Sequence, residues 1–285
     1  WRLRSLPPAG TFRLVCADVY LINRSGYNNM LSGGWKRSAA AGPAPRGNCK
    51  SKERWTNSNM GSWRTELDVL FRPRNIAFVG ASKNMTKWGN IILGNILSGG
   101  YTGEVHPINP REEWISERKV YKSILDIPGD IDLAMIVTPA GTVRDILAQC
   151  AQKGVKAAIV VPGGFSEEGG EGVELEREIA ELAAEKKIRT VGPNTMGIFS
   201  AEKSLYALMP PVRPNAGHIA FVAQSGNLGT QLMSIGQERE IGFSKFAASG
   251  NEAVLHCEDY LEYFGKDPET RVVLAYIEGL KKGRE

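Results

Sequence analysis

The chain has 285 residues, 42% of them hydrophobic, so it can bury a full core, and we expect one or two domains. Residues 1–59 carry ten Lys or Arg against two Asp or Glu, whereas the remainder carries 25 against 29. The net charge of +4 therefore comes from the leading segment and is poor support for a nucleic-acid partner. No apolar run has the length of a membrane span and no secretory signal is visible, so neither class is expected.

The four cysteines, Cys16, Cys49, Cys150 and Cys257, form no CxxC pair and have no histidine at ligand spacing. We expect reduced thiols in a cytoplasmic protein and no metal site.

Residues 1–59 are rich in Arg, Asn, Ser and Gly and show no sustained periodicity. We expect an irregular basic leader outside the fold, in which residues 16–22 could form a short strand and residues 38–47 are linker-like. A basic nucleic-acid arm is a less favoured alternative. The folded body is expected to begin between Met60 and Leu67.

From Leu67 onward, strands alternate with helices. Residues 76–79 form a wholly apolar run typical of a buried parallel strand, followed by a small-residue turn beginning at Gly80. Thr86 is expected to cap a helix that ends at Gly99. Further strands are expected at residues 104–108, 133–137, 157–161 and just before Gly192, with helices around residues 143–150 and 172–187. This alternation predicts a doubly wound parallel sheet with right-handed crossovers.

A second, similar series follows the Pro-rich residues 209–214. Strands are expected at residues 219–223, 243–248 and 272–277, with helices at residues 228–237 and around residues 260–264. Three strands are few for an independent domain, so we expect the truncated start of a second domain.

Ligands of open α/β sheets bind beyond the carboxyl ends of the strands. Those ends carry residues 80–83, 109–111, 138–140 and 162–164, which are small, kinked or basic and suit an anion. An NAD site would place an acidic residue after the second strand, where this chain has Arg111, so NADP or coenzyme A (CoA) fits better. The G-x-G-x-x-G pattern is absent, and a plain strand-to-helix turn with a solvated arginine remains an open alternative.

Residues 224–227, Gln-Ser-Gly-Asn, form a second strand–turn–helix start that suits a phosphate or an oxyanion. Ser225 is a weak nucleophile candidate, because G-x-S-x-G is absent. Of the histidines, His106 is expected to pack in a strand and His218 to be exposed, and His256 is a weak candidate for chemistry.

Four segments in order carry a family resemblance: residues 70–82 (LFRPRNIAFVGAS), 192–197 (GPNTMG), 224–227 (QSGN) and 249–253 (SGNEA). They resemble the NDP-forming acyl-CoA synthetases, including ADP-forming acetate–CoA ligases, and are similar to the alpha subunit of succinyl-CoA synthetase. The resemblance covers about residues 67–285. It implies a Rossmann-like CoA-binding domain at residues 66–195 and the truncated start of a flavodoxin-like ligase domain at residues 196–285.

The resemblance implies a role for each matching position. Gly80, Ala81, Ser82 and Lys83 would approach the CoA diphosphate, and Asn109 and Arg111 would lie near the CoA nucleotide. Thr138, Pro139, Pro162 and Gly163 would line the CoA cleft, with Asn194 near the pantetheine end. Ser225, Gly226 and Asn227 would hold the phosphate of a phosphohistidine that Glu278 orients. That histidine's place lies beyond the Glu278 match, and residues 254–257 replace a stretch that usually carries acidic residues.

The function implied is an ADP-forming acid–CoA ligase, which joins a small carboxylic acid to CoA through an acyl phosphate and a phosphohistidine. Its implied partners are CoA, the acid, and an ATP-grasp domain or beta subunit that binds ATP or ADP with Mg²⁺, in an oligomer without nucleic acid or membrane. This chain alone is expected to bind CoA without turnover. The alternatives are a non-catalytic CoA-sensing module of a protein acetyltransferase fusion and, less favoured, an NADP-dependent oxidoreductase.

Overall fold

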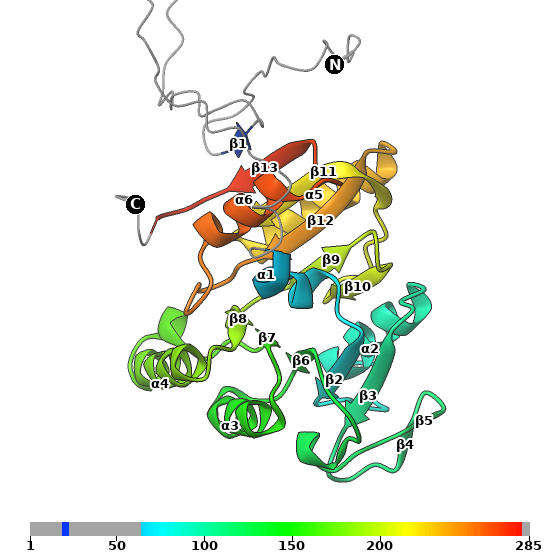
Figure 1. Cartoon of the computed structure of the whole chain (residues 1–285), viewed down its shortest axis with the longest axis vertical. Coiled ribbons are helices and arrows are strands. Elements are labelled where there is room, and N and C mark those ends of the chain that lie inside the picture. The colour runs from blue at the N-terminus through cyan, green and yellow to red at the C-terminus, as the bar shows by residue number, and fades with distance from the viewer. Residues whose placement is uncertain (1–18, 23–63, 281–285) are drawn as a thin grey trace, which may run out of the picture.

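The computed structural model describes residues 19–22 and 64–280, which form two large sheets and a small two-stranded one, with helices between and around the two large sheets (Figure 1). The first sheet is five-stranded and wholly parallel, in the order β3-β2-β6-β7-β8. Its strands are β2 (Asn75–Val79), β3 (Glu104–Ile108), β6 (Leu133–Ile136), β7 (Ala157–Val160) and β8 (Arg189–Val191). The predicted doubly wound parallel sheet is therefore confirmed.

Helices cover both faces of this sheet because its strands are apolar on both sides. The helices α3 (Val143–Lys153) and α4 (Glu171–Glu185) pack on one face, where Val143, Leu147 and Ile179 are buried. The helix α2 (Trp88–Ser98) packs on the other face through Ile92 and Ile96.

The expected cap of α2 is wrong. The N-cap residue is Lys87, and the Thr86 hydroxyl instead donates to Asn84 Oδ1 at 2.8 Å. Both the backbone N–H and the hydroxyl of Thr86 donate to Asn84 Oδ1 in a local turn, so the helix begins one residue later. Trp88, the first residue of α2, is half exposed.

The second sheet is six-stranded and mixed, in the order β1-β13-β11-β12-β9-β10. Its strands are β1 (Val19–Ile22), β9 (Gly197–Ser200), β10 (Leu205–Leu208), β11 (Asn215–Ala223), β12 (Gly242–Ala248) and β13 (Val272–Tyr276), and its helices are α5 (Gly226–Glu238) and α6 (Cys257–Lys266). The strands β11, β12 and β13 and both helices match the predicted second series. The sequence analysis missed the β9–β10 hairpin, which joins β12 antiparallel.

The strand β1 runs antiparallel to β13, with Val19 opposite Tyr276 and Ile22 opposite Val273. It falls within residues 16–22, where a short strand was considered, so these four residues of the leader are paired with the second sheet. The rest of the leader lies outside the described residues.

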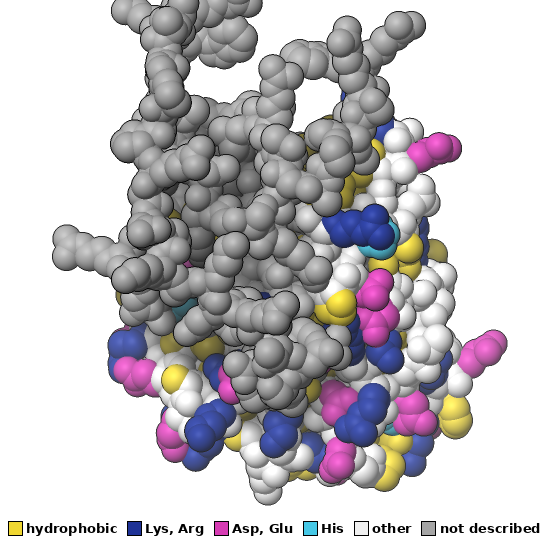
Figure 2. Space-filling view, turned by 45° about the horizontal axis from the view of Figure 1, so that its top comes forward, with side chains coloured by type: hydrophobic (Ala, Val, Ile, Leu, Met, Phe, Trp, Pro, Cys, Tyr) yellow, Lys and Arg dark blue, Asp and Glu magenta, His cyan; other side chains and the backbone are white. Residues whose placement is uncertain are grey.

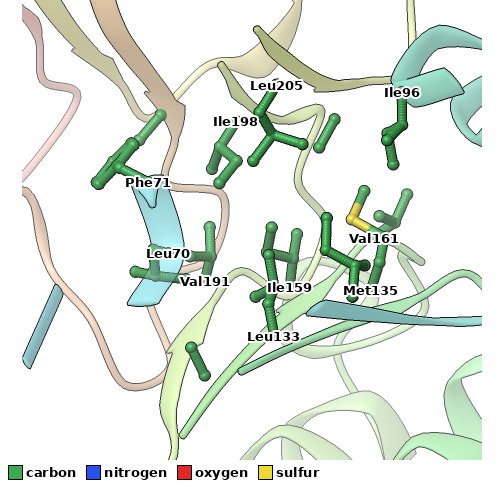
Figure 3. Packing of buried hydrophobic residues seen from close by; sticks show 14 of the residues in the cluster. Leu70, Phe71, Ile96, Leu133, Met135, Ile159, Val161, Val191, Ile198 and Leu205 are labelled. Carbon is green, nitrogen blue, oxygen red and sulfur yellow. The ribbon is translucent and has the colours of Figure 1, made fainter. Parts of the chain in front are cut away.

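A shared core joins the two sheets (Figure 3). Leu133, Met135 and Ile159 on the first sheet face Ile198 and Leu205 of the β9–β10 hairpin. The helix α1 (Arg64–Phe71) closes one side of this core with Leu70 and Phe71, both fully buried. Because these side chains form one cluster, the apolar surface that each sheet buries depends on the other.

The remaining elements are short: β4 (Trp114–Ile115), β5 (Arg118–Lys119) and the 3₁₀ turns η2 (Ile124–Asp126), η3 (Ala140–Thr142) and η4 (Ser166–Glu168). None of the helices within residues 64–280 combines the length and apolar character needed to cross a membrane. Among the described residues that are visible in Figure 2, basic and acidic side chains are interspersed.

Candidate functional site

A cleft of about 930 Å³ lies where the carboxyl ends of the parallel strands of both sheets meet. The first sheet contributes the loops after β2, β6, β7 and β8, and the second contributes the start of α5 and the loops after β12 and β13. Ten residues that the sequence analysis singled out line it: Gly80, Thr138, Pro139, Pro162, Gly163, Asn194, Ser225, Gly226, Asn227 and Glu278. Segments up to 198 residues apart in sequence therefore share one cavity.

Five other candidates are not among the described lining residues: Ala81, Ser82, Lys83, Asn109 and Arg111. Ala81 is fully buried, and the Asn109 side-chain amide donates to its carbonyl at 2.7 Å. Lys83 forms an ion pair with Glu112 at 2.7 Å. The backbone N–H groups of Gly80 and Ala81 both donate to the Ile108 carbonyl at the end of β3, so Ala81 and Asn109 lie next to the cleft wall that Gly80 forms.

Glycine is required where the start of α2 meets the turn after β2. Gly80 has φ +92°, and a Cβ there would lie 2.6 Å from the carbonyl oxygen of Val137. A Cβ on Gly89 would lie 2.0 Å from the carbonyl oxygen of Gly80. Only backbone without side chains permits this approach, which holds the N-terminus of α2 at the wall of the cleft.

The N-termini of α2 and α5 both line the cleft. The first turns of these two helices, both described in full, hold no acidic side chain. Ser225 is the N-cap of α5, and its hydroxyl accepts from the Leu228 N–H at 3.4 Å. Its hydroxyl is thus used as a helix cap, while the positive ends of two helix dipoles face one cavity. This arrangement suits an anion.

Gln224 fixes the loop after β13, a contact that the sequence analysis missed. Its Oε1 accepts from the backbone N–H of Glu278 at 2.5 Å and of Gly279 at 3.0 Å, and its Nε2 donates to the Gly279 carbonyl at 2.7 Å. One side-chain amide therefore holds the Glu278 backbone beside the turn that starts α5.

Glu167 and Asn251 join the two sheets at another part of the cleft wall. The sequence analysis did not select Glu167, and it included Asn251 in the segment 249–253 without giving it a role. The Asn251 amide donates to the Glu167 carboxylate and to Glu176 Oε2, the latter at 2.8 Å. Burial would raise the pKa of Glu167, but the hydrogen bonds from Asn251 and from the backbone N–H groups of Gly164 and Phe165 outweigh it. The net pKa is below the ordinary value.

Other lining residues were also missed: Thr86, Lys87, Trp88, Gly89, Met196 and Met209. The first four belong to the start of a helix that the sequence did predict at a phosphate-type turn. Extending the candidate site from the turn at Gly80 into the first turn of this helix would have included these four residues.

The described histidines lie outside the residues that line the cleft. His106 is half-buried, and burial lowers its pKa. His218 is exposed, and its Nδ1 lies 2.9 Å from the Glu269 carbonyl. His256 is the N-cap residue of α6, and its backbone N–H donates to Asp259 Oδ2 at 2.8 Å. None of the three is placed to react in the cleft. Within residues 64–280, no three His, Cys, Asp or Glu side chains lie close enough together to hold a metal ion.

Comparison with known proteins identifies the class. Residues 74–201 match the family described as CoA binding domain, and residues 216–285 match the succinyl-CoA ligase like flavodoxin domain. The fold and the cleft thus define a two-domain α/β protein in which a CoA-binding domain precedes a ligase-type flavodoxin domain.

Three similar proteins indicate which family within this class the chain resembles. The chain is 40% identical over 224 residues to ADP-forming acetate–CoA ligase II of Archaeoglobus fulgidus, covering 77% of this chain and 33% of the relative. It is 41% identical over 218 residues to the alpha subunit of ADP-forming acetate–CoA ligase II of Pyrococcus furiosus, covering 76% and 47%. A solved acetyl-coenzyme A synthetase 1 of Ca. Korarchaeum cryptofilum, in complex with phosphate and ADP, superposes with a TM-score of 0.74 at 40% identity, covering 76% and 47%.

The chain belongs to the family of NDP-forming acyl-CoA synthetases, as its sequence motifs indicated. It spans less than half the length of each of these relatives.

Proposed function

We propose that this chain is the CoA-binding part of an ADP-forming acid–CoA ligase of the cytoplasm. Residues 66–195 form its CoA-binding domain, and residues 196–285 begin its ligase domain. The observation that carries the proposal is the shared cleft, in which the N-termini of α2 and α5 face one cavity from opposite domains. A ligase that must bring an anionic nucleotide cofactor to a phosphoryl group needs two anion sites within reach of each other.

The residues of the first domain would bind CoA. Gly80 would allow close backbone approach of the diphosphate, and the positive end of the α2 dipole would favour its negative charge. Thr138-Pro139 and Pro162-Gly163 line the cleft, and Asn194, which lines it too, would lie near the pantetheine end of CoA. The nucleotide end of CoA would lie outside the cleft itself. It would contact Asn109 and Arg111, which follow β3, and Lys83, which pairs with Glu112 there. When bound, CoA supplies the thiol that takes up the acyl group.

The residues of the second domain would hold the phosphoryl group. Backbone N–H groups at Ser225, Gly226 and Asn227 stabilise negative charge at the start of α5. Glu278, held by Gln224, would accept a hydrogen bond from the imidazole of a phosphorylated histidine. The whole enzyme would take a small carboxylic acid. An ATP-grasp domain or beta subunit would supply ATP or ADP with Mg²⁺, within an oligomer.

The CoA-sensing alternative is not favoured, because the two relatives described above are CoA ligases. An NADP-dependent oxidoreductase is disfavoured because the chain lacks the dinucleotide glycine pattern.

Calorimetric titration of the chain with CoA and with NADP tests the proposal. We expect CoA to bind and NADP not to bind. Thr138→Glu places a negative charge on the cleft wall and should weaken CoA binding about tenfold or more. Gln152→Glu adds the same charge on the exposed side of α3 and should leave the affinity unchanged. Equal binding of NADP, or equal CoA affinity in both variants, would overturn the proposal.

A further inference from the structure

Trp88 is a large apolar side chain left exposed in the cleft. It is the first residue of α2, its exposed fraction is 50%, and it lines the cavity. A tryptophan can bury 150–250 Å² in a contact, roughly, so an indole left half exposed at a cleft wall is an unused contact surface.

The backbone that carries Trp88 is held rigidly. Gly89 lies against Gly80, with no space for a Cβ between them. The Asn90 side-chain amide donates to the Ser82 carbonyl at 2.9 Å, and the Lys87 N–H donates to the Asn84 carbonyl at 3.1 Å. The indole is therefore presented from a fixed position, and little conformational entropy of the backbone would be lost when a ligand covers it.

The surroundings of Trp88 favour one part of CoA. Val137, Val161, Met196 and Met209 give the same cavity an apolar wall. Met196 reaches the anion-binding turn, since a Cβ on Gly226 would lie 2.5 Å from Met196 Cγ. The exposed Arg111, at the end of β3, is not among the described lining residues. Trp88 thus shares one cavity with these apolar residues and with the start of α5.

We propose that Trp88 packs its indole face against the pantetheine arm of CoA, a contact that rests on the proposed function. The arm is a narrow chain with a gem-dimethyl group and two amides, which suits an apolar wall carrying one flat aromatic surface. By covering the indole, the arm is directed along the cleft toward the turn at Ser225, so the thiol end approaches the phosphoryl site.

Calorimetry with CoA, 4′-phosphopantetheine and 3′,5′-ADP tests the contact. Trp88→Ala should weaken binding of CoA and of 4′-phosphopantetheine about tenfold and leave 3′,5′-ADP unchanged. Trp88→Phe keeps an aromatic face and should restore most of the affinity. Trp114→Ala is the matched control, because Trp114 is 58% exposed on β4 and is not among the described lining residues. It should have no effect.

Tryptophan fluorescence gives a second readout. Addition of CoA should change the emission of the wild type and of Trp114→Phe, and Trp88→Phe should abolish most of this change. If Trp88→Ala binds 4′-phosphopantetheine as tightly as the wild type, the contact does not exist. If the loss falls on 3′,5′-ADP instead, Trp88 stacks on adenine and the assignment to the pantetheine arm is wrong. Failure of the wild type to bind CoA would refute the proposed function itself.

Discussion

Gln224 and Glu278 are joined at the edge of the cleft by a hydrogen bond of 2.5 Å from the Glu278 backbone N–H to the Gln224 side chain. Gln224 directly precedes the N-cap of α5, and Glu278 follows β13. The proposed phosphate-binding turn and the proposed orienting carboxylate are thus fixed to each other by one side chain. The parallel strands β11 and β13 end side by side, and the hydrogen bonds of the Gln224 side-chain amide continue their pairing beyond the last backbone pair.

Replacing Gln224 should loosen the Glu278 loop. Gln224→Leu removes three hydrogen bonds at a partly exposed site and should lower the free energy of unfolding by about 1–2 kcal/mol. Hydrogen exchange should be about tenfold faster at the Glu278 and Gly279 amides. Gln231→Leu, on the exposed side of α5, is the control and should change neither quantity. Unchanged exchange at both amides in Gln224→Leu would show that the Gln224 side chain does not hold the Glu278 loop in place.

The buried ion pair of Lys245 and Asp267 should be essential to stability. Their charged atoms lie 2.6 Å apart, and both side chains are almost fully buried. Lys245→Met removes this ammonium from the buried Asp267 carboxylate, which keeps its contacts with Arg72 at 3.3 Å and with the Thr270 hydroxyl, and should cost about 3 kcal/mol in chemical denaturation. Lys186→Met breaks an exposed ion pair with Glu185 and should cost less than about 1 kcal/mol. Similar losses in the two variants would show that burial of the Lys245 pair has no special effect.

Acid should weaken the fold through Asp267. Burial alone would raise the pKa of Asp267, but hydrogen bonds from Lys245 and Thr270 and the charges of Lys245 and Arg72 outweigh it. They hold the pKa below the ordinary value of 3.8. Because the pKa is lower in the folded state, the stabilisation is complete above that ordinary value and is lost as pH falls through the folded pKa.

The measurement is the free energy of unfolding from about pH 5 to about pH 2 in the wild type and in Asp267→Asn. The variant should be less stable at the upper end and should lose less as pH falls. Parallel profiles would mean that Asp267 does not contribute to acid unfolding.

Arg111 should recognise the phosphate on the ribose of CoA. Arg111 is exposed at the end of β3, where the Asn109 side chain accepts from its backbone N–H at 2.8 Å and shapes the loop. Arg111→Glu should weaken CoA binding about tenfold and leave the affinity for 3′-dephospho-CoA nearly unchanged. Arg118→Glu, exposed on β5, is the charge-matched control. An equal loss for both ligands in Arg111→Glu would place the nucleotide end elsewhere.

The sequence by itself determined the local units of this protein. The apolar run of β2, the turn at Gly80 and the helix after it could be predicted because strand burial, a glycine turn and helix periodicity depend on neighbouring residues. The turn at Gln224 was predicted for the same reason. Parallel strands expose their carboxyl ends at one edge, so residues 80–83, 109–111, 138–140 and 162–164 were expected to lie near one another. Of these candidates, Gly80, Thr138, Pro139, Pro162 and Gly163 line the cleft.

Only the tertiary structure decided which of these units meet. The β9–β10 hairpin gave no regular signal and is held by pairing with β12, a strand far away in sequence. Gln224 reaches Glu278, and Asn251 reaches Glu167, across separations of 54 and 84 residues. Trp88 lines the cleft because the close approach of Gly89 to Gly80 holds the start of α2 at the cleft wall. Such contacts depend on how two sheets pack against one core, and no local pattern of residues encodes that packing.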